Sequence, residues 1–141
     1  MTKWCDPPDF LKNLPPQKLK TSWKRGLAYE RTLARNLPDH FPGWTFRHGA
    51  WIENEGKFFQ PDFVIESPGG LVVLADARYS YSKSKDEKIL KVYLPLLRIL
   101  FPGRDFVTIQ FNRRCPFETI APKEIPSLCP GHYVVATDRG Y

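Results

Sequence analysis

The chain has 141 residues, 42% of them hydrophobic and 14% aromatic, which suits one domain with one packed core and excludes a compositionally disordered protein. No apolar run approaches the roughly 20 residues that a membrane-spanning helix needs, so we expect no membrane partner. The net charge of +6 favours a polyanionic partner such as nucleic acid, because attraction at long range and counterion release both assist binding.

The N-terminal segment predicts neither export nor regular structure. Residues 1–8 contain no apolar stretch and no small-residue cleavage site, so we expect no secretory signal and a cytoplasmic location. Proline fixes φ and lacks a backbone N–H, and four of the 14 prolines lie within residues 1–20. We therefore expect an extended or irregular arm over residues 1–20, followed by a single domain over residues 21–141.

The first predicted helix runs from about Thr21 to Leu37, and Pro38 ends it because proline disfavours a helical conformation in the preceding residue. Residues three and four positions apart share one face of a helix, and here that face carries Trp23, Leu27, Glu30, Ala34 and Leu37. Glu30 is the acidic exception on this apolar stripe. It is expected either at the edge of the stripe or facing a polar pocket.

Three predicted strands follow in succession. Residues 44–52 form the first strand, and the turn at residues 53–56 contains Asn and Gly, which tolerate positive φ. Residues 57–66 return as the second strand, with Pro61 at a point where the pairing breaks. After a glycine-containing turn, residues 71–79 form the strongest strand of the sequence, rich in apolar and β-branched side chains. The short turns predict an antiparallel meander.

The second predicted helix runs from about Ser84 to Phe101, with a kink or a break at Pro95. Residues 105–111 predict a fourth strand, and residues 133–137 are the candidate for a fifth strand in an otherwise irregular C-terminal extension. The element order is then α-β-β-β-α-β. This order predicts an α/β fold in which helices flank a mixed sheet of four to five strands.

Two acidic residues stand where the predicted meander brings neighbouring strands together. Asp62 follows Pro61 in the second strand, and Asp76 lies fourteen positions later in the third strand, within Asp76-Ala77-Arg78. Side chains alternate along a strand, so Asp76 and Arg78 point to the same face. Two carboxylates held across a hairpin repel each other, and a divalent cation relieves that repulsion. The pattern therefore indicates a metal site at Asp62 and Asp76.

These residues resemble the signature of the PD-(D/E)XK nucleases, which is Pro-Asp followed on the next strand by an acidic residue, any residue and Lys. The resemblance covers about residues 22–112 and implies an αβββαβ core like that of restriction endonucleases and Holliday-junction resolvases. It implies a Mg²⁺-dependent endonuclease that hydrolyses phosphodiester bonds, with DNA as the expected substrate and Mn²⁺ as an alternative ion. The implied metal ligands are Asp62, Asp76 and the carbonyl of Ala77, with Glu30 acting through water or binding a second ion.

Arg78 departs from the family pattern, because the signature carries Lys at this position. Arginine stays protonated and cannot be a general base, but it can hold a phosphate and stabilise developing negative charge. Either the metal alone activates water, or Lys83 or Lys85 substitutes, or the site is catalytically degenerate. The alternative function is an inactive nuclease-like module that binds nucleic acid or docks in a larger complex, with Asp76 and Arg78 as an ordinary ion pair.

Aromatic and basic residues around the motif are candidates for nucleic-acid binding. Such residues in alternation suit a groove that follows a phosphate backbone and stacks bases, although solvated strand ends explain them equally well. The candidates are Tyr79, Tyr81, Lys83, Lys85, Gln110, Arg113 and Arg114. Small nucleases of this kind are often dimeric, so the resemblance implies nucleic acid and a second copy or a partner subunit as binding partners.

Overall fold

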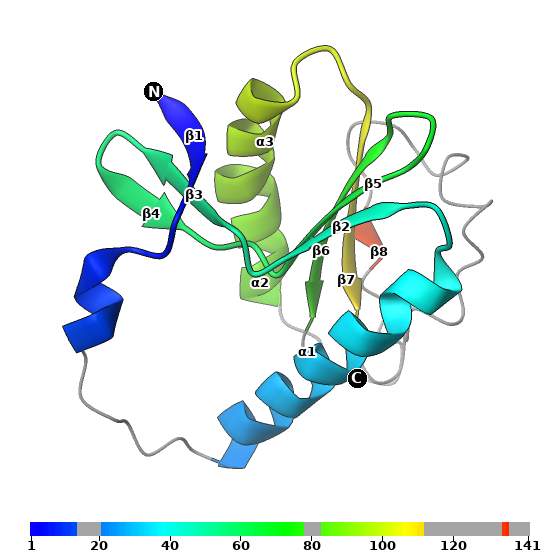
Figure 1. Cartoon of the computed structure of the whole chain (residues 1–141), viewed down its shortest axis with the longest axis horizontal. Coiled ribbons are helices and arrows are strands. Elements are labelled where there is room, and N and C mark those ends of the chain that lie inside the picture. The colour runs from blue at the N-terminus through cyan, green and yellow to red at the C-terminus, as the bar shows by residue number, and fades with distance from the viewer. Residues whose placement is uncertain (14–20, 78–82, 112–133, 136–141) are drawn as a thin grey trace.

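The structure is a computed structural model that describes residues 1–13, 21–77, 83–111 and 134–135. Within these ranges the chain forms a large mixed sheet, a small antiparallel sheet, and helices packed beside them (Figure 1). The predicted α/β class and the predicted mixed sheet of four to five strands are therefore confirmed. In this described part of the chain, no helix combines the length and the apolar character that crossing a lipid bilayer requires.

The large sheet contains five strands of the described chain. They are Thr45–His48 (β2), Phe63–Glu66 (β5), Val72–Ala77 (β6), Phe106–Phe111 (β7) and Val134–Val135 (β8). Their order is β2-β5-β6-β7-β8. β5 pairs antiparallel with β2 and β6, whereas β7 pairs parallel with β6 and β8. The predicted meander, the fourth strand and part of the fifth are confirmed.

The small sheet has the order β1-β3-β4 and is antiparallel throughout. Its strands are Thr2–Cys5 (β1), Trp51–Asn54 (β3) and Lys57–Phe59 (β4). The turn between β3 and β4 has positive φ at Glu55 (52°) and Gly56 (75°), as a two-residue hairpin of type I′ requires. A short 3₁₀ helix, Asp9–Asn13 (η1), follows β1. The β3–β4 hairpin is inserted between two strands of the large sheet.

Three expectations about this region are wrong. Residues 57–66 do not form one returning strand, because β4 and β5 belong to different sheets. Residues 44–52 do not form one strand, because Gly49, with a φ of 65°, turns the chain between β2 and β3, and these strands join different sheets. The irregular arm predicted for residues 1–20 is wrong at its start, because β1 pairs along its whole length with β3. The expected break at Pro61 is confirmed, since the gap between β4 and β5 falls there.

The first long helix, α1, spans Thr21–His40 and runs past Pro38, where the sequence predicted it to end. Pro38 lacks the N–H of one helical hydrogen bond. However, Leu37 and Phe41 are only 0% and 2% exposed, and the Phe41 N–H donates to the Leu37 carbonyl at 2.9 Å. Burial of these two side chains therefore outweighs the backbone preference against a helix before proline.

The buried face of α1 also differs from the predicted face. Leu33 and Leu37 are buried in the core, so the residues that contact the sheet recur at four-residue steps. Leu27 is 39% exposed, and its predicted place on the apolar stripe is wrong. Glu30 and Ala34 are half-buried. Glu30 thus lies at the edge of the buried face, which is one of the two expected positions.

The second helical segment is continuous but not uniform. It consists of Lys83–Lys88 (α2), a π-helical turn at Ile89–Tyr93 (η2) and Leu94–Leu100 (α3). The Leu94 N–H donates to the carbonyl of Ile89, five residues earlier, which is the hydrogen bond of a π turn. This widened turn directly precedes Pro95, which has no N–H to donate. The predicted distortion near Pro95 is therefore confirmed.

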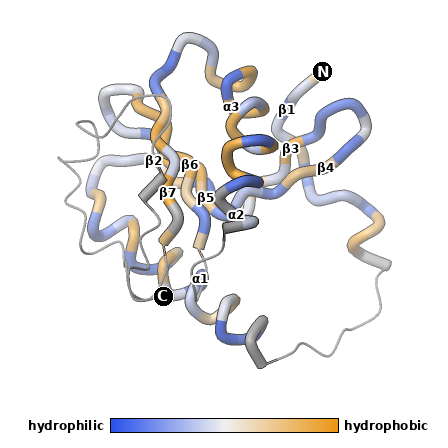
Figure 2. The backbone as a smooth tube through the Cα atoms, turned by 180° about the vertical axis from the view of Figure 1, so that it is seen from behind, coloured by the Kyte–Doolittle hydropathy of each residue, from blue (hydrophilic) through white to orange (hydrophobic). Residues whose placement is uncertain are grey.

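Helices cover both faces of the large sheet. Phe63 and Ala75 belong to the core cluster beside α1, whereas Val64 and Leu74 belong to the cluster beside η2 and α3. Figure 2 shows hydrophobic residues concentrated along the central strands and α3. All six residues of β6 are buried. Thus the strand that carries Asp76 lies at the centre of a three-layer arrangement.

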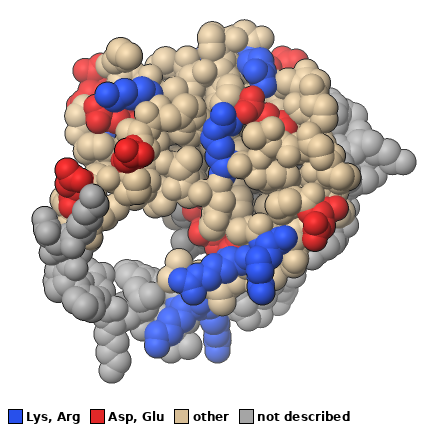
Figure 3. All heavy atoms as spheres, in the orientation of Figure 1, with Lys and Arg blue, Asp and Glu red and all other residues tan. Residues whose placement is uncertain are grey.

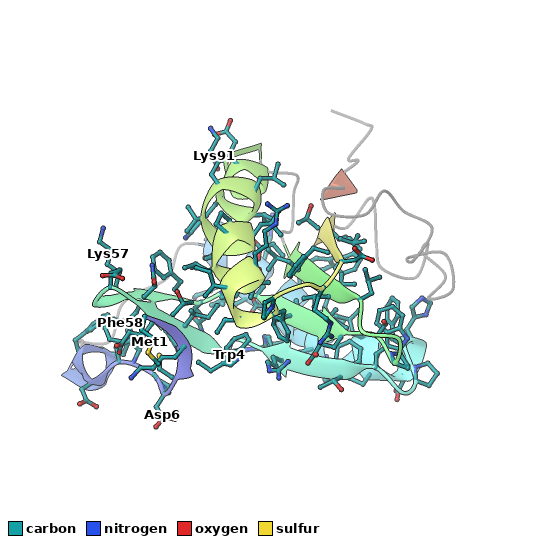
Figure 4. The ribbon with its side chains drawn as sticks, turned by 90° about the horizontal axis from the view of Figure 1, so that it is seen from above. Met1, Trp4, Asp6, Lys57, Phe58 and Lys91 are labelled. Carbon is teal, nitrogen blue, oxygen red and sulfur yellow. The ribbon has the colours of Figure 1, made fainter. Side chains whose placement is uncertain are left out.

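A charged cluster joins the small sheet to the large one. Glu66 accepts hydrogen bonds from Arg47 at 2.5 Å and from Arg104 at 3.0 Å. The Arg47 guanidinium lies 5.0 Å from the ring centroid of Trp4, at the side of the small sheet nearest the large one (Figure 4), and 5.6 Å from that of Phe101. Burial raises the pKa of Glu66, but hydrogen bonds and positive charge from the two arginines outweigh burial and lower it.

Candidate functional site

The candidate site lies where the ladder between β5 and β6 opens. The ladder ends where Phe63 pairs with Ala75, and the same register continued by two residues would set Pro61 opposite Ala77. Proline has no N–H to contribute to the ladder at that position. The Ala77 N–H instead donates to Oδ2 of Asp62 at 2.8 Å. The Asp62 carboxylate therefore accepts the hydrogen bond from the Ala77 N–H that a backbone carbonyl would accept if the ladder continued.

Asp62 and Asp76 meet at this opening. The backbone N–H of Asp62 donates to Oδ1 of Asp76 at 3.3 Å. Asp76 is 0% exposed, whereas Asp62 is half-buried. The structure thus brings together the two residues that the sequence singled out as metal ligands, one at the end of a fully buried strand and the other beside it.

Neighbouring groups fix the segment that carries Asp62. The Gly49 N–H donates to the Asp62 carbonyl at 2.9 Å, and the Gln60 side chain donates to the Gly49 carbonyl at 2.9 Å. On the other face of the sheet, the Tyr93 hydroxyl donates to the Gln60 carbonyl at 3.4 Å. The backbone around Asp62 is therefore held by Gly49, which directly follows β2, and by the π turn, which are separate parts of the fold.

Glu30 does not join the two aspartates. Its carboxylate lies 3.0 Å from Nε2 of His48, whose ring stacks on Phe63 with centroids 4.8 Å apart. His48 and Phe63 are register partners on the α1 face of the sheet, whereas Asp76 shares the opposite face with Leu74. In the described ranges, no three His, Cys, Asp or Glu side chains form a group able to hold a metal ion.

The oxygen atoms at the opening fit a small, hard divalent cation. Asp62 and Asp76 lie side by side, and like charges in a buried position repel unless a proton or a cation neutralises them. The carbonyl of Ala77, the residue after Asp76, is the backbone oxygen next to this pair in the chain, and Pro61 has no N–H that could donate to it. Mg²⁺ binds one or two carboxylates and keeps several waters, so this small donor set is sufficient for it.

The other predicted site residues are described only in part. Gln110 pairs in register with Asp76 from β7, so its backbone adjoins the site, while its side chain lies outside what the structure describes. Lys83 and Lys85 lie in α2, again without described side chains. The remaining predicted residues lie outside the described ranges, and they are Arg78, Tyr79, Tyr81, Arg113 and Arg114.

A basic surface on α1 was not identified from the sequence. Figure 3 shows Lys and Arg side chains gathered along α1, while charges of both signs are scattered elsewhere on the same face. An open depression of about 570 Å³ lies on this helix, lined by Ala28, Arg31, Thr32, Ala34, Arg35 and His48. The sequence signal that could have revealed this surface is the spacing of Lys24, Arg31 and Arg35, which places them on one face of the helix.

Comparison with known proteins found no family model that matches this sequence and no similar curated protein.

Proposed function

We propose that the protein is a Mg²⁺-dependent endonuclease of the PD-(D/E)XK type that hydrolyses phosphodiester bonds in DNA. The observation that carries this proposal is the meeting of Asp62 and Asp76 where Pro61 opens the ladder between β5 and β6. The element order supports a restriction-endonuclease-like core, because α1, three antiparallel strands, a helical crossover and a parallel strand follow one another. The β3–β4 hairpin is then an insertion between the first two core strands.

The residues at the opening have separate roles in this proposal. Asp62 and Asp76 bind the ion, with the carbonyl of Ala77 as a further ligand, and Mn²⁺ can replace Mg²⁺. The ion supplies Lewis-acid polarisation of the phosphate group and of water. The Ala77 N–H orients the Asp62 carboxylate through the 2.8 Å hydrogen bond. Arg78, which cannot accept a proton, binds the phosphate and stabilises its developing charge.

A second candidate function is an inactive nuclease-like module that binds nucleic acid within a larger complex. Two observations favour it over an enzyme. Arg78 replaces the signature Lys, and Glu30 is engaged by His48 instead of lying with the aspartate pair. This module would bind DNA in a salt-sensitive manner without turning it over.

Cleavage of supercoiled plasmid and of a four-way DNA junction, in Mg²⁺ or Mn²⁺, distinguishes the two functions. Asp62→Asn and Asp76→Asn keep the side-chain shape and remove the charge, and Asp6→Asn is the matched control at an exposed position in the small-sheet region (Figure 4). The endonuclease proposal expects cleavage by the wild-type and control proteins and none by either site variant. Unchanged cleavage by folded Asp76→Asn protein would contradict it, and DNA binding without cleavage by the wild type would favour the inactive module.

A further inference from the structure

The exposed side of α1 carries three basic residues and one small residue in line, which we term the α1 stripe and define as Lys24, Ala28, Arg31 and Arg35. These residues are four, three and four positions apart, so they lie on one face of the helix. All four are exposed. At about 1.5 Å per residue, the stripe is about 16 Å long.

The three cations of the α1 stripe form no ion pair with the described acidic residues nearby, Glu30 and Asp39. Among the described residues, Lys24, Arg31 and Arg35 form no ion pair, whereas Arg47 and Arg104 both bind Glu66. Arg31 and Arg35 are four residues apart, a spacing at which like charges repel each other on a helix. An anionic partner would remove this repulsion and use all three cations at once.

The depression on α1 joins the stripe to the α1 face of the large sheet. Its lining includes Arg31 and Arg35 from the stripe and His48 from β2. His48 stacks on Phe63, the residue that follows Asp62 in the chain. A polyanion lying along the stripe would therefore pass the chain segment that carries Asp62, and it would approach Asp76 around the end of β6, because Asp76 points to the face that α1 does not cover.

We propose that the α1 stripe binds the sugar-phosphate backbone of the nucleic acid and directs it toward the Asp62–Asp76 site. That this nucleic acid is also the substrate of the enzyme rests on the proposed function. Duplex DNA carries one negative charge per about 1.7 Å of its axis, so a 16 Å line of three cations can meet a different phosphate at each position. The contacts are to phosphates, so they contribute affinity without sequence preference.

The test measures binding of labelled duplex DNA by fluorescence anisotropy over a series of salt concentrations, in chelator so that no cleavage occurs. Arg31→Gln/Arg35→Gln removes two charges from the stripe. Lys57→Gln/Lys91→Gln removes two exposed charges from the β4 hairpin and from η2, at sites that point away from the large sheet (Figure 4). This second variant is the matched control for net charge.

Each phosphate contact adds about 0.9 to the slope of log affinity against log salt, so the stripe variant should lose about 1.8 from the slope. Its affinity at about 0.1 M salt should fall on the order of tens of fold, and the control should change little. Equal slopes for the stripe variant and the wild type would overturn the proposal. Stronger competition by polyglutamate than by unlabelled DNA would also overturn it, in favour of an acidic protein partner.

The outcome does not depend on catalysis, because binding is measured without divalent metal. Asp76→Asn protein should keep the wild-type salt slope while losing cleavage. If the wild-type protein never cleaves DNA, but the stripe variant still loses salt dependence of binding, the endonuclease proposal is refuted and the proposal for the α1 stripe stands. A stripe variant that loses only cleavage, with its binding unchanged, would refute the stripe.

Discussion

Gly49 is the residue whose substitution should damage the candidate site from outside it. Its φ of 65° lies in the left-handed region, and it separates the two strands that enter different sheets. The Gly49 N–H donates to the Asp62 carbonyl, and the Gly49 carbonyl accepts a hydrogen bond from the Gln60 side chain. A Cβ at this position would lie 3.2 Å from Nε2 of Gln60, so Gly49→Ala both strains the backbone and displaces that side chain.

The magnitude follows from these two effects. Holding a residue other than glycine in the left-handed region costs about 1–2 kcal/mol, and loss of the Gln60 hydrogen bond costs about 0.5–1.5 kcal/mol. We therefore expect Gly49→Ala to lower the free energy of unfolding by about 1.5–3.5 kcal/mol. Gly26 lies inside α1 with open space where a Cβ would stand, so Gly26→Ala should instead raise it by about 0.5–1 kcal/mol.

Equilibrium urea unfolding of the two alanine variants beside the wild type measures both effects with the same chemical change. The free energies of the variants should differ by about 3 kcal/mol and lie on opposite sides of the wild type. If Gly49→Ala were as stable as the wild type, the positive φ at Gly49 would not be a constraint, and its role in fixing Asp62 would be refuted.

Two further predictions concern the ion cluster and the core. The pKa of Glu66 is lowered in the folded protein by Arg47 and Arg104, so its stabilisation is present above the unfolded pKa and is lost as pH falls through the folded pKa. Glu66→Gln should lower the free energy of unfolding at pH 7 by about 1–3 kcal/mol and make it fall less on acidification. Urea unfolding at pH 7 and in steps below pH 5 measures both effects. A pH profile equal to that of the wild type would contradict this prediction. Leu37→Ala should cost about 2–5 kcal/mol because the side chain is 0% exposed, whereas Leu27→Ala, at a position 39% exposed, should cost less than about 0.5 kcal/mol; equal costs would contradict the observed face of α1.

The elements that the sequence predicted correctly are those that depend on local chemistry. β6 is a run of buried apolar and β-branched residues beside glycines, which few structures other than a central strand accommodate. The breaks at Pro61 and Pro95 follow from the missing N–H, whatever the fold. Local signals of this kind also brought Asp62 and Asp76 together, although Asp62 lies just before β5 and not within it.

The elements that were predicted wrongly depend on contacts between distant residues. Thr2 bonds Asn54 across 52 positions, and no local pattern in residues 2–5 indicates that β1 completes a second sheet. The extension of α1 past Pro38 depends on the burial of Phe41 in the core. The α1 stripe is hidden for the same reason, because composition does not reveal which arginines have acidic partners in the fold.

The central claim is that Asp62 and Asp76 hold a divalent cation, and calorimetric titration with Mn²⁺ tests it most directly. Wild-type protein and the Asp6→Asn control should bind Mn²⁺ alike, and Mg²⁺ should compete with it. Loss of a residue that only supports a metal ligand weakens metal binding by about tenfold or more. Asp76 is proposed to be a ligand itself, so Asp76→Asn should weaken Mn²⁺ binding by more than about tenfold. Mn²⁺ binding that is equal in the wild type and in folded Asp76→Asn protein, or absent from both, would contradict the claim.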